Sequence, residues 1–142
     1  MRFWDSAAIV PLIIDERLTT SMRGLYESDT RQSVWCLTPV EVWSAMARKR
    51  RASDIASPQM RTARHRLELL SASWDEIDDI AAVRRRAQRL LEVHPLRAAD
   101  ALQLAAALVL VSDRPEGFEF VTLDSRLAEC VEAEGFRVVM PK

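Results

Sequence analysis

Four acidic residues, Asp5, Glu41, Asp100 and Asp124, carry the chemistry that this sequence offers, and each stands at or near the predicted start of a helix. Carboxylates held within a few ångströms of one another repel, and their pKa values rise unless protons or a cation offset the charge. No His or Cys stands at ligand spacing, so the donors are oxygens, which favour Mg²⁺ or Mn²⁺ over Zn²⁺. Such an ion lowers the pKa of a water and stabilises charge on phosphoryl oxygens. If the fold gathers them, these acids predict a metal-dependent nuclease.

The order of elements along the chain determines whether the acids can meet. Short apolar runs alternate with amphipathic helices, which predicts an α/β sandwich whose mostly parallel sheet is flanked by helices on both faces. Helices that follow parallel strands begin at the carboxyl ends of those strands, where ligands bind. Asp5, Glu41 and Asp124 directly follow strand-like runs. We expect these three to converge, with Asp100 joining them if its helix begins at the same edge.

Hydrophobic periodicity and capping residues predict the elements themselves. We expect strands near residues 2–4, 33–37, 74–77, 118–123 and 136–140, the first of them central in the sheet. A first helix begins at Asp5-Ser6, and further helices are expected over 17–29, 39–51, 57–70, 79–91, 96–111 and 124–135. The helix after Pro95 is the most apolar of these and must be buried on most sides.

Each acid has a second interpretation when it is taken alone. Asp and Glu near a helix N-terminus cap backbone N–H groups or favour the helix dipole. On that reading the protein is a non-catalytic module that binds RNA or protein, and its acids serve as helix caps. A third reading, an aspartate-based phosphotransfer domain, would require a partner acid two residues after Asp5, where Ala7 stands instead.

Composition sets the limits of the interpretation. The chain has 142 residues, of which 49% are hydrophobic and 29% are charged, so we expect residues 1–142 to form a single domain with a buried core. No signal peptide and no apolar run of about 18 residues is present, which predicts a cytoplasmic protein that does not enter a membrane. Cys36 and Cys130 are expected to pack as small apolar residues, and His65 and His94 are read as surface or helix-end residues.

Basic residues are concentrated in the middle of the chain, although the net charge is only -1. Arg48, Lys49, Arg50 and Arg51 stand together, and further arginines follow at 61, 64 and 66 and between 84 and 89. These runs are either solvated helix faces or an RNA-binding footprint. The three glycines are too scattered for a phosphate-binding loop, and no GxSxG motif occurs.

Four segments together resemble the VapC type of PIN domain over nearly the whole chain. They are Phe3-Trp-Asp-Ser-Ala7, Thr38-Pro-Val-Glu41, Leu96-Arg-Ala-Ala-Asp-Ala-Leu-Gln-Leu-Ala105 and Phe120-Val-Thr-Leu-Asp124. The third segment is the most specific of them. The resemblance implies a PIN-like three-layer sandwich and a Mg²⁺- or Mn²⁺-dependent endoribonuclease, usually the toxin of a type II toxin–antitoxin pair.

The same resemblance implies roles for individual residues. Asp5, Asp100 and Asp124 would be metal ligands, Glu41 would bind metal directly or through the attacking water, and Ser6 and Thr122 would support them by hydrogen bonds. It also implies an RNA substrate, a cognate antitoxin protein and a homodimer. An antitoxin segment could lie in a groove between early helices, although a stripe at helical spacing is more often core. The candidate groove residues are Leu12, Ile13, Leu18, Met22, Leu25 and Trp43.

Overall fold

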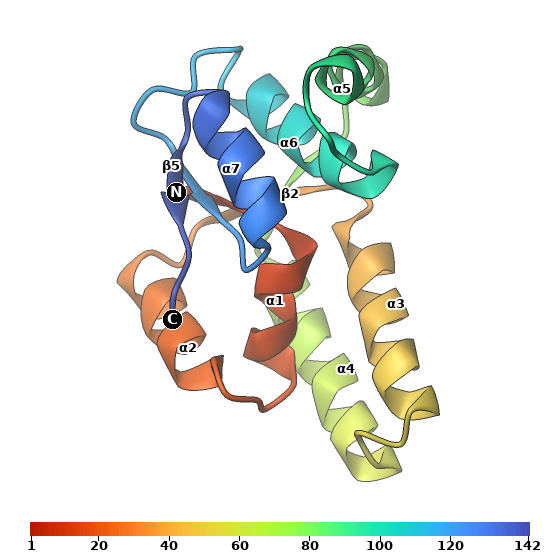
Figure 1. Cartoon of the computed structure of the whole chain (residues 1–142). Helices are drawn as coiled ribbons and strands as arrows, with labels where there is room; N and C mark the ends of the chain where they lie inside the picture. The colour runs from red at the N-terminus through yellow and green to blue at the C-terminus, as the bar shows by residue number, and fades with distance from the viewer.

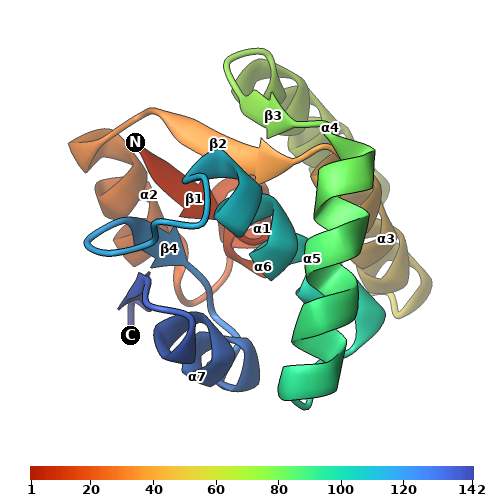
Figure 2. The same ribbon diagram turned by 90° about the horizontal axis from the view of Figure 1, so that it is seen from above.

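A five-stranded, entirely parallel sheet forms the centre of the molecule in a computed structural model that describes residues 1–142 (Figure 1). The strands are β1 (Arg2–Trp4), β2 (Gln32–Trp35), β3 (Asp75–Ile77), β4 (Glu119–Val121) and β5 (Arg137–Val139). Their order is β3-β2-β1-β4-β5, which can be followed from above in Figure 2. The N-terminal strand is therefore central, as the sequence predicted, and the carboxyl ends of all five strands share one edge.

Helices cover both faces of the sheet and complete the predicted three layers. They are α1 (Ser6–Ile13), α2 (Thr19–Ser28), α3 (Thr38–Arg51), α4 (Ser57–Ser71), α5 (Ile80–Val93), α6 (Ala98–Leu110) and α7 (Ser125–Ala133). Figure 1 shows α5, α6 and α7 on one face and the first four helices on the other. None of them combines the length and the apolar character that crossing a bilayer requires.

Two hydrophobic cores lie on the two faces of the sheet, because successive strand residues point in opposite directions. Phe3 and Phe120, which are partners in the register of β1 and β4, place their ring centroids 5.0 Å apart in the core beneath α5, α6 and α7. Trp4 and Val121, the next pair, belong to the other core. Both cores continue through β1, so the strand that precedes Asp5 is held from both sides.

Helix α6 is buried along most of its length, as its apolar sequence predicted. Ala101 and the run from Leu104 to Ala107 are fully buried, and α5 packs along it. One polar side chain, Gln103, is also 0% exposed. A buried amide requires hydrogen-bonding partners, so the position of Gln103 indicates that this face of α6 meets other polar groups.

Several local expectations change in the structure. Helix α3 begins at Thr38, one residue before the predicted start, and the Thr38 hydroxyl accepts a hydrogen bond from Gln103. Asp79 caps α5, which agrees with the helix expected over 79–91. The two cysteines are free, as expected. His94 is more than a helix end, because its Nε2 lies 2.7 Å from a carboxylate oxygen of Glu134.

The proposed apolar groove between the early helices is only partly present. Ile13 and Met22 are 1% and 0% exposed, so these two residues are ordinary core residues and do not line a groove. Leu12 lines a hollow of about 370 Å³ together with residues of α2 and α4. Trp43 lies exposed on α3 and does not line that hollow.

Candidate active site

Asp5 is the most buried of the four acids, with 3% of its surface exposed at the carboxyl end of β1. Its backbone N–H donates to the carbonyl of Val121, which continues the ladder between β1 and β4 by one residue. The Thr122 hydroxyl donates to Asp5 Oδ2 at 3.0 Å, and Thr122 is itself fully buried. The side chain of Asp5 is therefore held in place by a residue from the other end of the sequence.

Asp5 occupies the N-cap position of α1, but its side chain makes no capping hydrogen bond. The expectation that Asp5 caps this helix is wrong, because the carboxylate turns instead toward Thr122 and Ser6. Glu41 and Asp100 lie in the first turns of α3 and α6 and do not cap them. Only Asp124 behaves as a cap, with Oδ1 accepting from the N–H groups of Arg126 and Leu127.

Glu41 is fixed by two donors from different helices. The Ser6 hydroxyl donates to Glu41 Oε2 at 2.6 Å, which is much closer than its 3.5 Å contact with Asp5 Oδ1. Gln103 Nε2 donates to the same Oε2 at 3.0 Å and to the Thr38 hydroxyl at 3.1 Å. A carboxylate only accepts, so Glu41 determines which end of the Gln103 amide faces it.

Gln103 was not identified as a site residue from the sequence. The signal was present, because it is an isolated amide in an otherwise apolar segment of the most apolar helix. Its Oε1 is buried and has no hydrogen-bonding partner. Since both of its N–H groups are used by Glu41 and Thr38, the residue has a positioning role toward Glu41 that packing alone does not require.

The acids interact electrostatically. Burial raises the pKa of Asp5 to about 7, and the charges of Asp100 and Glu41 add to this rise against the hydrogen bond from Thr122. Burial also raises the pKa of Asp100, again helped by two acids, Asp124 and Glu41. Arg97 opposes the rise at Asp100. Asp100 thus lies within electrostatic reach of Asp5, Glu41 and Asp124, and Asp5 also lies within reach of Glu41.

The same side chains do not form a ready-made coordination shell. No group of three acidic, histidine or cysteine side chains is arranged closely enough to hold a metal ion. The hydrogen bonds that hold the acids explain why their side chains stand apart. Glu41 is held by Ser6 and Gln103, while Asp124 is held by backbone N–H groups. The donor set nevertheless consists of carboxylate and hydroxyl oxygens, which is the chemistry that a hard divalent cation selects.

Two hollows open beside the acids. One, of about 490 Å³, is lined by Ser6, Glu41, Arg48 and Lys49 among others. The other, of about 390 Å³, holds Asp100 and Asp124. The residue before Asp100, Ala99, lines the first hollow, so the two hollows adjoin across the start of α6.

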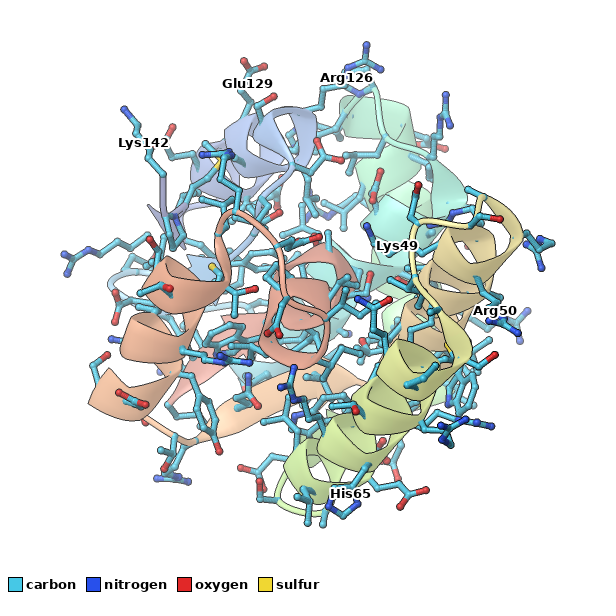
Figure 3. The ribbon with its side chains drawn as sticks, turned by 90° about the horizontal axis from the view of Figure 1, so that it is seen from below. Lys49, Arg50, His65, Arg126, Glu129 and Lys142 are labelled. Carbon is cyan, nitrogen blue, oxygen red and sulfur yellow. The ribbon has the colours of Figure 1, made fainter.

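The predicted basic stretch, residues 48–51, lies in the last turn of α3, and its side chains point in two directions. Arg48 and Lys49 line the first hollow, whereas Arg50 and Arg51 do not. Figure 3 shows Lys49 on the side of α3 that faces α1 and Arg50 on the outer side. Arg48 donates to Ser44 at 2.9 Å, and Lys49 pairs with Glu16 at 3.5 Å. Two of the four residues are thus placed to meet a molecule bound at the acids.

The PIN domain model matches residues 2–132, which is nearly the whole chain and includes all four acids. This chain belongs to the PIN domain family. The resemblance to VapC-type PIN domains noted from the sequence is confirmed by two curated relatives from Mycobacterium tuberculosis, Ribonuclease VapC45 and Ribonuclease VapC49. Each is 29% identical over 136 residues, covering 96% of this chain and 92% of the relative.

Solved structures show the same PIN domain fold at low sequence identity. The crystal structure of VapBC2 from Rickettsia felis bound to a DNA fragment from its promoter has a TM-score of 0.70 at 10% identity, covering 99% of this chain and 98% of that one. The crystal structure of FitAcB from Neisseria gonorrhoeae has a TM-score of 0.67 at 14% identity, covering 97% and 96%. The predicted fold class is therefore confirmed.

Proposed function

We propose that this PIN domain is a Mg²⁺-dependent endoribonuclease whose site consists of Asp5, Glu41, Asp100 and Asp124, with Ser6 and Thr122 in support. The observation that carries the proposal is the state of Asp5, which is buried, makes no capping bond and has its pKa raised to about 7 beside two other acids. A helix cap needs none of these features. Such a carboxylate gains most from a nearby cation.

The four acids would hold Mg²⁺, and Mn²⁺ would take its place. Glu41, Asp100 and Asp124 are only partly buried, so their side chains have room to turn toward an ion near Asp5. A divalent cation supplies two effects there: it lowers the pKa of a water and offsets charge on phosphoryl oxygens. Thr122 and Ser6 orient the carboxylates of Asp5 and Glu41, while Gln103 keeps Glu41 directed at the site.

We further propose that the protein is the toxin of a type II toxin–antitoxin pair in the cytoplasm, working as a homodimer on RNA and inhibited by a cognate antitoxin. The similarity to two VapC ribonucleases over 96% of the chain supports this proposal. The likeness to VapBC2 supports only the fold on which such a pair is built. Arg48 and Lys49, which line the first hollow beside Glu41, would contact the RNA backbone.

Incubation of the purified protein with structured RNA tests the activity. With Mg²⁺ we expect internal cleavage, and with excess EDTA we expect none, because the carboxylates alone repel the phosphodiester. A DNA of the same sequence serves as the matched control substrate. Cleavage that continues at full rate in EDTA, or an RNA that stays intact with both Mg²⁺ and Mn²⁺, would contradict the proposed function.

A further inference from the structure

Two arginines that the sequence analysis did not single out line the second hollow. Arg97 immediately precedes α6 and Arg126 lies in the first turn of α7, and both face the same hollow as Asp100 and Asp124. Arg126 also lines a neighbouring hollow of about 420 Å³, which continues away from the acids past Pro95. A basic wall therefore borders the acidic site on the side opposite α3.

Neither arginine side chain is bonded to another group of the protein, although the charge of Arg97 acts on Asp100. The Arg97 and Arg126 side chains make no hydrogen bond and no ion pair, although two carboxylates share their hollow. Arginines elsewhere in the chain do pair when an acid is near, as Arg86 does with Asp113 at 2.7 Å. An unpaired guanidinium beside a carboxylate site keeps its five N–H donors available for an anionic ligand.

The two bases of the first hollow, Arg48 and Lys49, are less free than these arginines. Lys49 is paired with Glu16, whereas Arg48 keeps its charge and gives one N–H donor to the neutral Ser44 hydroxyl. Each hollow contains two acids and two bases, but only in the second hollow are both bases unpaired. An extended anion that crosses the acids would therefore find its stronger attachment at Arg97 and Arg126.

We infer that Arg97 and Arg126 form a phosphate-binding wall for a single RNA strand, which crosses the acids from the α3 hollow to the hollow between α6 and α7. This inference rests on the proposed ribonuclease function and adds where the strand lies. The two arginines are positioning residues, because they hold phosphates beside the scissile bond and do not take part in its cleavage. Guanidinium groups suit this task, since they bind phosphate oxygens bidentately.

Steady-state cleavage of a fluorescent single-stranded oligoribonucleotide, measured at several salt concentrations, tests the inference. We expect Arg97→Ala together with Arg126→Ala to raise KM on the order of tenfold and to change kcat little. The slope of log KM against log salt should fall by about 0.7 for each phosphate that the variant no longer binds. Replacing both by Lys should restore most of the salt slope, because the charge is kept. Arg114→Ala with Arg137→Ala, two exposed arginines outside the predicted basic runs and outside both hollows, is the matched control and should leave both constants unchanged.

Two results would overturn the inference. One is a double variant whose KM and salt slope equal those of the wild type. The other is a loss confined to kcat with an unchanged salt slope, which would mean that Arg97 acts only through its charge on Asp100. Fluorescence anisotropy of the same RNA repeats the comparison without cleavage. A wild type that binds RNA through these arginines but never cuts it would reject the proposed function and leave the phosphate wall supported.

Discussion

Replacing Asp5 with Asn is expected to abolish RNA cleavage and, in the same protein without metal, to raise its stability. The loss of rate should be at least about 100-fold, because even outer partners of metal ligands typically contribute 10- to 100-fold. The gain in stability follows from the burial of a carboxylate whose pKa stands at about 7 instead of 3.8. At about pH 8 in EDTA, the free energy of unfolding should rise on the order of 2 to 4 kcal/mol.

Opposite effects on rate and stability separate a functional acid from a structural one. A residue retained only for capping would lose stability on replacement, by about 1 kcal/mol. Chemical denaturation in EDTA gives the free energy of unfolding, and cleavage in Mg²⁺ on the same preparations gives the rate. Asp54→Asn is the matched control, since Asp54 is exposed and its side chain makes no hydrogen bond. A destabilised Asp5→Asn variant that still cleaves would refute the assignment of Asp5.

The second large effect is a loss of stability of the metal-free protein as pH rises. Asp5 binds its proton more tightly in the folded state, so between its ordinary pKa of 3.8 and about 7 the folded protein holds more protons than the unfolded chain. Stability therefore falls with increasing pH across this window and levels off above it. The Asp5 contribution amounts to about 4 kcal/mol over the window, and Asp100 acts in the same direction.

Other carboxyl groups make stability change with pH in the opposite direction, so the measurement must separate their contributions from that of Asp5. Ion pairs and hydrogen bonds lower the pKa values of Asp29, Asp113 and Glu134, so their contribution is lost only as pH falls through those lowered values. The difference in unfolding free energy between wild type and Asp5→Asn, followed from about pH 5 to pH 8 in EDTA, cancels them. We expect this difference to grow with pH. A constant difference would show that Asp5 titrates normally and would remove the electrostatic argument for a cation.

Local sequence signals were sufficient for the fold. Residues 2–4 form the central strand as predicted, and the helix that follows Pro95 is buried as its composition indicated. These features depend on periodicity, capping and proline, all of which act over a few residues. The PIN-like motifs then placed three acids after parallel strands, which determines the edge of the sheet at which they lie.

The details of the site depend on partners that are distant in sequence, and they were missed for that reason. Asp5 was expected to cap α1, but its carboxylate instead accepts a hydrogen bond from Thr122, which is 117 residues away. Gln103 holds Glu41 from 62 residues away, and no local pattern indicates that pairing. Arg97 and Arg126 become one wall only because α6 and α7 begin beside the same hollow. Tertiary packing therefore decides which polar residue acts on which acid.

Anomalous scattering from a crystal of the protein soaked in Mn²⁺ tests the central claim most directly. The account predicts a Mn²⁺ peak at the carboxyl edge of the sheet, with Asp5 and at least one of Asp100 and Asp124 among its ligands, and no peak there in crystals of Asp5→Asn. Wild-type crystals with no manganese at these carboxylates, or with manganese only elsewhere, would contradict the claim that the four acids form a metal site.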